Sequence, residues 1–137
     1  MTHSVDDAAR ATEDWIDDFV RHLGWRDRDR AYSALMAALH ALRSYLKQDD
    51  VIYLGAQLPA LLRGHYYEGW HPKTHLGSKS RSAFLERVHD NLHRDPGVDA
   101  EAVARTMFAL LAARLPTAEL EDAKACTPHE LHNLWPS

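Results

Sequence analysis

The sequence lacks the features that mark a secreted, membrane-spanning or disulfide-stabilised protein. Its 137 residues contain a single cysteine, Cys126, which excludes an intrachain disulfide and an all-cysteine metal site. The longest unbroken apolar run, Met107 to Ala113, is far shorter than the ~20 residues that cross a bilayer. The N-terminus is polar and acidic, with no cationic start followed by an apolar stretch. These absences predict a cytoplasmic protein that has no membrane span.

An excess of positive charge is also missing. The chain has 16 Lys and Arg against 20 Asp and Glu, a net charge of -4 with histidine neutral, which disfavours a general nucleic-acid-binding surface. Histidine is abundant: the ten residues can gain protons near neutral pH, so solubility and self-association should depend on pH. With 45% hydrophobic and 26% charged residues, the chain has the composition of one globular domain, residues 1–137.

Apolar residues recur at steps of three and four along the whole chain, which predicts helices, and no stretch shows the alternation of a strand. The first helix should end near Gly24, and either Asp27 or Asp29 can cap the second. A third, shorter helix should begin near Asp50 and be interrupted by Pro59, which can start the next one. The fold class is therefore expected to be all-α.

The same order of helices returns after residue 80. Asp99 is placed to cap a second long helix. From that helix onward, apolar positions repeat at a constant offset of 69 residues, which pairs Pro59 with Pro128 and Tyr66 with Trp135. A shared proline and shared apolar positions at one offset indicate an internal duplication.

The duplication predicts a helical bundle made of two tandem repeats packed face to face. The first repeat covers residues 14–70, a linker covers 71–79, and the second repeat covers 80–136. Each repeat alone buries too little apolar surface to be stable, so the long helices should pack on each other. Leu39 and Leu111 are expected to be buried at that junction.

The last helix carries a local start signal. Thr127 is placed as the N-cap, Pro128 as the first helical residue and Glu130 as the third. This pattern predicts a helix that begins at Pro128.

The segment from Gln57 to Trp70, QLPALLRGHYYEGW, resembles a characteristic stretch of the bacterial and archaeal family called domain of unknown function 2267. A first helix with a phenylalanine, a long Ala/Leu helix, a Leu-Pro step and the restart FLERV at 84–88 also resemble that family, over roughly residues 14–135. The resemblance implies an all-α tandem-repeat fold in a small soluble bacterial protein. It implies no activity, cofactor or catalytic residue.

A basic and aromatic segment joins the two predicted repeats and is the first candidate for a ligand site. It could recognise an anion through its arginine and histidines, with an aromatic ring as a stacking face. The alternative, which we favour, is that the aromatic side chains cover the seam between the repeats, with Trp70 mostly buried. The residues of this candidate site are Arg63, His65, Tyr66, Tyr67, Trp70, His71 and His75.

Two histidine patterns could hold a metal ion. Cys126, His129 and His132 are spaced i, i+3, i+6, and a thiolate with two imidazoles is a possible zinc set. The alternative is a half-buried cysteine beside two solvated histidines. His89 and His93 stand one helical turn apart but lack the glutamate of zinc proteases, so we expect them to be surface histidines.

No catalytic pattern is readable: a glycine-rich phosphate loop, a nucleophile elbow and a serine beside a base are all missing. The sequence therefore predicts a non-enzymatic protein-interaction or self-association module without a cofactor, with a protein partner or a second copy as its ligand. Some of its four tryptophans could act as exposed anchors. The alternative is a protein that binds a small anionic ligand or a metal.

An enzyme would be favoured if at least two of four particular histidines converged in a pocket. These are His40, His65, His71 and His75.

Overall fold

The computed structural model describes residues 4–72 and 79–136, and in these residues every regular element is a helix. The all-helical prediction is confirmed. The elements are α1 (Val5–Leu23), α2 (Arg28–Arg43), α3 (Gln48–Ala56), α4 (Ala60–Tyr67), α5 (Arg81–Asn91), α6 (Ala100–Arg114), α7 (Thr117–Cys126) and the 3-10 helix η1 (His129–Leu134). No helix among the described residues is long and apolar enough to cross a membrane.

Polar side chains cap the N-terminal ends of the four longest helices, α1, α2, α5 and α6. The Asp27 carboxylate accepts the Arg30 amide at 3.1 Å at the start of α2, and Asp99 accepts two amides at the start of α6, as predicted. Ser4 caps α1 well before the first apolar face at Trp15, so this helix is longer than its apolar pattern indicates. Gly24 ends α1 with a φ of 80°, which favours glycine.

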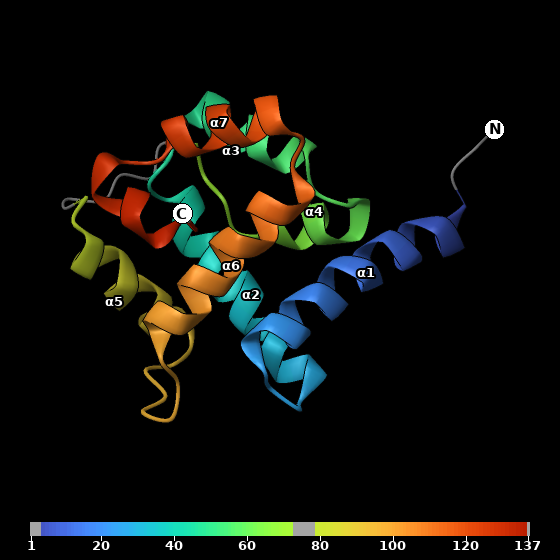
Figure 1. The fold of residues 1–137 in the computed structure, drawn as a ribbon, viewed down its shortest axis with the longest axis horizontal. Coiled ribbons are helices and arrows are strands. Elements are labelled where there is room, and N and C mark those ends of the chain that lie inside the picture. The colour runs from blue at the N-terminus through green and yellow to red at the C-terminus, as the bar shows by residue number, and fades with distance from the viewer. Residues whose placement is uncertain (1–3, 73–78, 137) are drawn as a thin grey trace.

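Helices α2 and α6 lie at the centre and contact each other, and α1 and α5 each pack on both of them (Figure 1). The shorter helices α3 and α7 contact each other above this bundle, α4 packs on α1, α2 and α3, and η1 packs on α6. The N-terminal half of α1 extends beyond the body of the molecule (Figure 1).

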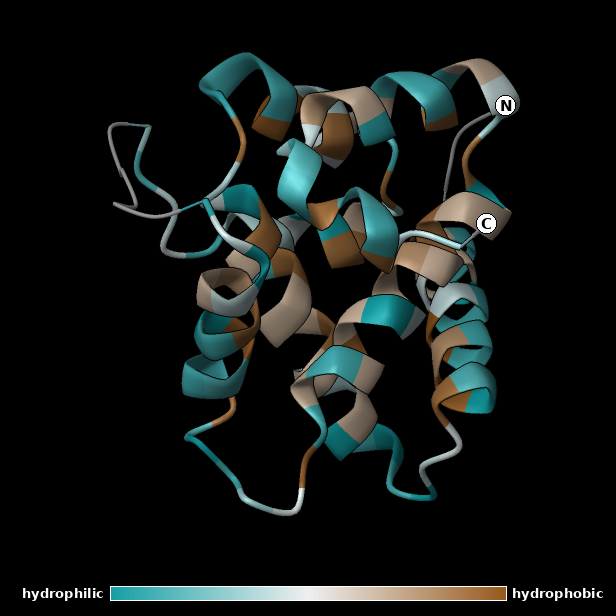
Figure 2. Cartoon of the chain, turned by 60° about the vertical axis from the view of Figure 1, so that its left-hand side comes forward, coloured by the Kyte–Doolittle hydropathy of each residue, from teal (hydrophilic) through white to brown (hydrophobic). Residues whose placement is uncertain are grey.

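The core is formed by buried side chains of α2 and α6 together with those of the helices packed around them. Figure 2 marks the hydrophobic residues along the helices in brown. Helix α2 contributes five buried alanines, which let its neighbours approach closely. Leu39 and Leu111 are each 1% exposed, which confirms their predicted burial. Trp15 and Trp135 are buried as well, whereas Trp25 and Trp70 are only half-buried. The expectation that Trp70 is mostly buried is therefore met only in part.

The predicted start of the last helix is wrong in its detail. The segment after Pro128 is a 3-10 helix, Pro128 itself is the N-cap, and no side chain caps it. The Thr127 hydroxyl donates instead to the Lys124 carbonyl at 2.7 Å. The physical reason is that α7 runs up to Cys126. The Thr127 hydroxyl therefore bonds a free carbonyl at the C-terminal end of α7 and not a free amide at the start of the next helix.

Candidate functional site

Three of the predicted ligand-binding residues form hydrogen bonds that connect α4 to α3. Tyr66 is fully buried, and its hydroxyl donates to the Val51 carbonyl at 2.8 Å. The half-buried Tyr67 donates to the Ile52 carbonyl at 3.4 Å. Arg63 satisfies carbonyls at the C-terminal end of α3: its Nε donates to Gly55 at 2.9 Å and its Nη2 to Leu58 at 2.8 Å.

The other four predicted residues lie in different places. His65 faces a groove on the side of α2, while Trp70 and His71 line a separate pocket. His75 lies outside the described residues. The predicted set of seven is thus not brought together as one site, and its members Trp70 and His71 are the pair that shares a pocket.

This cavity, which we call the Arg43–Arg87 pocket, has a volume of about 180 Å³. It lies where α2 ends, α3 begins, the chain leaves α4 and α5 passes alongside. Two arginines, a histidine and an indole contribute to it, and no Asp or Glu of the described residues lines it. The lining residues are Arg43, Ser44, Leu46, Gln48, Gly69, Trp70, His71, Pro72 and Arg87.

The pocket has an excess of positive charge. Burial lowers the pKa of Arg43, Tyr66 and Glu68 act to raise it, and the positive charge of Arg87 lowers it further. Arg43 is anchored by a hydrogen bond from its Nη1 to the Tyr66 carbonyl. Among the described residues, neither Arg43 nor Arg87 forms an ion pair with a carboxylate.

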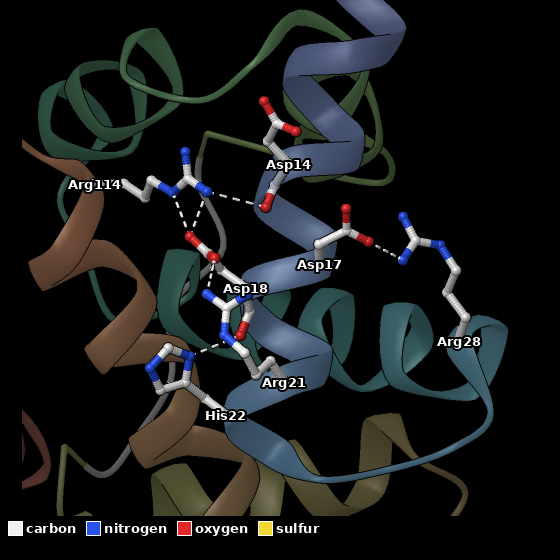
Figure 3. Close-up of polar contacts among 7 residues, drawn as sticks. All are labelled: Asp14, Asp17, Asp18, Arg21, His22, Arg28 and Arg114. Atoms are coloured by element: carbon white, nitrogen blue, oxygen red, sulfur yellow. Dashed lines mark hydrogen bonds and ion pairs between the residues drawn. The ribbon is translucent and has the colours of Figure 1, made fainter.

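Several other arginines of the protein form ion pairs with carboxylates. Figure 3 shows Arg28 beside Asp17, and Arg114 and Arg21 on the two oxygens of Asp18. A guanidinium carries five N–H donors and keeps its charge at all accessible pH values. Two such groups without a carboxylate, facing one cavity, form an arrangement that can bind an anion.

A glycine turn places Trp70 at the pocket. Gly69 has a φ of 74°, a conformation that favours glycine, and the Trp70 amide donates to the Tyr67 carbonyl at 3.0 Å. A side chain at position 69 would come within 3.6 Å of Arg43 Nη2. The indole ring of Trp70 packs on the Tyr67 ring with ring centres 5.7 Å apart, and this contact helps to fix the position of the indole.

A second concave region, the His40–His65 groove, lies between α2, α4 and the end of α5 and has a volume of about 450 Å³. Its lining residues are Tyr32, Ser33, Met36, Ala37, His40, His65, Glu68, Asn91 and His93. His40 Nε2 donates to the His65 carbonyl at 2.7 Å, and His65 Nδ1 shares a hydrogen bond with the Tyr32 hydroxyl. The groove thus contains two of the histidines whose convergence would favour an enzyme.

Burial lowers the pKa of His40, although its hydrogen bond to the His65 carbonyl acts in the opposite direction. Burial therefore favours the neutral form of the His40 imidazole. His93 reaches the same groove from a turn: α5 ends at Asn91, and His93 has a φ of 58°. His89 and His93 are consequently not on one helix face, and His89 Nε2 donates to the Asp95 carbonyl at 2.9 Å.

The structure does not bring the predicted zinc ligands together. Among the described residues, no three His, Cys, Asp or Glu side chains are placed to hold one metal ion. Burial, with a further contribution from Asp50, raises the pKa of the Cys126 thiol to about 11, which disfavours the thiolate that binds metal. His132 Nε2 donates to the Thr127 carbonyl at 3.0 Å. The His129 ring lies edge-on to the His132 ring.

Sequence reasoning missed both arginines that define the pocket. Arg43 and Arg87 lie on α2 and α5, which are distant in the sequence and adjacent in the fold. Arg43 belongs to no local motif, and Arg87 is noted only as part of the FLERV stretch at 84–88, so no signal in the sequence pairs the two.

The fold and the pocket together define an all-helical domain with a basic pocket beside its central helix. The chain matches the model of the family described as an uncharacterized conserved protein, DUF2267, over residues 12–134. It therefore belongs to that family, as the resemblance of the segment ending at Trp70 indicated. A search of the curated proteins finds no match.

Proposed function

We propose that the chain is a non-enzymatic binding domain that recognises a small anion, or an anionic group, in the Arg43–Arg87 pocket. One observation carries this proposal: two guanidinium groups that lack carboxylate partners among the described residues line the same cavity. Their like charges disfavour each other, as the effect of Arg87 on the pKa of Arg43 indicates. An anion between them would convert this repulsion into two attractive, charge-assisted interactions.

Two further features support the same ligand chemistry. Gln48, the first residue of α3, lines the pocket, and the N-cap of that helix, Lys47, supplies no side-chain hydrogen bond to its free amides. The N-terminal end of a helix carries a partial positive charge that favours anions. Trp70 adds an apolar face, supported by Tyr67, against which a bound molecule can pack.

The test is thermal unfolding in the presence of phosphate or sulfate at constant ionic strength. A ligand that binds the folded state raises the unfolding midpoint with concentration. We expect both anions to raise the unfolding midpoint of the parent protein and of the variant Arg10→Gln, because Arg10 is exposed and does not line the pocket. Arg87→Gln should lose the effect. An unchanged midpoint in the parent protein, or an undiminished rise in Arg87→Gln, would overturn the proposal.

Protein interaction or self-association is a second candidate function. Ile52 on α3 and Leu61 on α4 are large apolar side chains that are 47% and 49% exposed. Because α3 and α4 contact each other, these two side chains can contribute to one apolar contact surface. We expect a mass above that of one chain by light scattering, and a return to one chain in Leu61→Lys. A single-chain mass at all concentrations would count against self-association.

The His40–His65 groove is the observation in favour of an enzyme, and we propose a structural role for it instead. His40 and His65 each commit a ring nitrogen to hydrogen bonds that connect α2 with α4. The carbonyl and the phenol that they contact are parts of the fold rather than substrate positions. A hydrolytic activity that disappears in His40→Gln, while the unfolding midpoint stays unchanged, would contradict this assignment.

We also propose that the two helical repeats are related by an approximate twofold symmetry. Exchanging α1 with α5, α2 with α6, α3 with α7 and α4 with η1 converts most contacting pairs of helices into other contacting pairs. The N-caps support the same offset: Lys47 and Pro116 begin α3 and α7, and Pro59 and Pro128 begin α4 and η1. This arrangement accounts for repeats that pack face to face across α2 and α6.

A further inference from the structure

We infer that the group bound by the Arg43–Arg87 pocket is a phosphate monoester attached to an apolar or aromatic fragment, rather than a carboxylate. This inference rests on the proposed anion-binding function and adds the class of the ligand. It depends on three properties of the pocket: its two fixed positive charges, its size and its indole wall.

The charge of the pocket favours a dianion. Arg43 and Arg87 each contribute a guanidinium group, which carries a positive charge, and no carboxylate of the described residues lines the cavity with them. A carboxylate neutralises one guanidinium and presents two oxygens in one plane. A phosphate monoester carries nearly two negative charges at pH 7 and three terminal oxygens, so it can accept hydrogen bonds from both arginines at once.

The size of the pocket limits what it can enclose. Its volume of about 180 Å³ is below the ~300–1,000 Å³ of sites that enclose a drug-sized ligand. A phosphate group with a few carbon atoms fits this space, whereas a whole nucleotide does not. The remainder of a larger molecule would therefore lie outside the cavity.

The walls of the pocket favour an apolar group next to the phosphate. Trp70, Leu46 and Pro72 line it together with the two arginines. The Trp70 ring is half-buried, and Tyr67 holds it from behind, so its remaining surface is accessible to a bound molecule. A planar or apolar substituent on the phosphate can pack on this surface, which inorganic phosphate cannot do.

Isothermal titration with phenyl phosphate, inorganic phosphate and benzoate at pH 7.5 and constant ionic strength tests the inference. We expect phenyl phosphate to bind at least about tenfold more tightly than benzoate, which lacks the second charge, and more tightly than inorganic phosphate, which lacks the ring. Trp70→Leu should reduce the affinity for phenyl phosphate to that for inorganic phosphate and leave the latter unchanged. Circular dichroism confirms that each variant is folded, and Trp70→Gln, which also removes the aromatic ring, replaces Trp70→Leu if that variant is not.

Arginine variants test the role of the two charges. Arg87→Gln should lower the affinity for phenyl phosphate about tenfold or more and abolish its advantage over benzoate. Arg87→Lys, which keeps the charge but not the fork of donors, should bind phenyl phosphate with an intermediate affinity. The matched control Arg10→Gln should behave as the parent protein.

The outcomes separate this inference from the proposed function. Benzoate that binds as tightly as phenyl phosphate would overturn the phosphate class and leave anion binding intact. Equal affinities for phenyl phosphate and inorganic phosphate would overturn the role of the indole wall and with it the inferred ligand. Failure of phosphate, phenyl phosphate and benzoate alike to bind would overturn both the inference and the proposed function.

Discussion

Tyr66 places a hydroxyl group in the interior of the protein, where the Val51 carbonyl accepts its hydrogen bond at 2.8 Å. Burial raises the pKa of this phenol, so it remains an uncharged donor at any pH at which the protein is studied. We expect Tyr66→Phe to lower the free energy of unfolding by about 1 kcal/mol, because the buried carbonyl loses a partner. Urea denaturation followed by circular dichroism measures this loss.

Tyr67→Phe is the matched control for that substitution. The Tyr67 hydroxyl makes a longer hydrogen bond, 3.4 Å to the Ile52 carbonyl, and its side chain is only half-buried. Its removal should change the free energy of unfolding by less than about 0.5 kcal/mol. Equal losses of unfolding free energy in the two variants would show that the buried hydrogen bond of Tyr66 stabilises the fold no more than the exposed one of Tyr67.

Gly55 is covered by the ring of Tyr67. A Cβ atom at this position would lie 2.7 Å from Tyr67 Cζ, well inside van der Waals contact. We expect Gly55→Ala to lower the free energy of unfolding by about 1–3 kcal/mol, because the Tyr67 ring must move away from α3. The denaturant midpoint of the variant measures the effect.

Gly64 provides the control for Gly55, since it also lies in a short helix but an added Cβ atom there would meet no heavy atom within 4 Å. Alanine favours the helix over glycine by about 0.5–1 kcal/mol, so Gly64→Ala should stabilise the protein. If Gly55→Ala were stabilising as well, the close approach of Tyr67 would have no energetic consequence.

At the scale of elements, one carboxylate connects α1 to α6. Arg114 Nε on α6 donates to Asp18 Oδ2 at 2.7 Å, and Arg114 Nη2 donates to the Asp14 carbonyl at 3.0 Å (Figure 3). Burial raises the pKa of Asp18, but the hydrogen bonds and charges of Arg114 and Arg21 outweigh this effect. The pKa of Asp18 consequently lies below its ordinary value of 3.8.

We expect Asp18→Asn to lower the free energy of unfolding by about 1 kcal/mol at pH 7. Because the folded-state pKa is depressed, the ionised carboxylate stabilises the fold at all pH values above its ordinary pKa. This contribution is lost as the pH falls through the folded-state pKa. The difference between parent and variant should therefore shrink progressively as the pH falls below 3.8, and urea midpoints measured at pH 7 and at a series of pH values below 3.8 test it.

Asp14→Asn is the control for the connection between α1 and α6. Arg114 contacts the backbone carbonyl of Asp14, while the Asp14 side chain points away from Arg114 (Figure 3). Its substitution should leave the urea midpoint nearly unchanged at both pH values. A pH-independent loss in Asp18→Asn would indicate a packing effect rather than the ion pair.

At the scale of the whole molecule, the two halves of the chain share one core. Helix α2 of the first half contacts α5 and α6, and α1 contacts α6. Separating the halves exposes the apolar faces of all these helices, and a fragment of this size buries little surface. We expect the fragment 80–137 to show weak circular dichroism and no cooperative urea transition, whereas the full chain shows one. A cooperative transition in the isolated fragment would contradict a shared core.

The sequence by itself determined the helical class and many of the helix limits. Gly24, Asp27 and Asp99 are local signals that act within one helical turn, so they can be recognised without knowledge of the fold. The burial of Leu39 and Leu111 follows from helical periodicity for the same reason. The cluster of aromatic residues that ends at Trp70 also predicts, from the sequence alone, a segment that either packs in the fold or binds a ligand.

Only the tertiary structure decided which of those residues share a surface. It turned Tyr66, Tyr67 and Arg63 toward α3 and left Trp70 half-buried beside Arg43 and Arg87. It also ended α7 at Cys126, so that Thr127 serves that helix and the metal set does not converge among the residues that the structure describes. The physical reason is that a pocket forms where helices distant in sequence pack together, and the distances between their side chains depend on that packing rather than on local spacing.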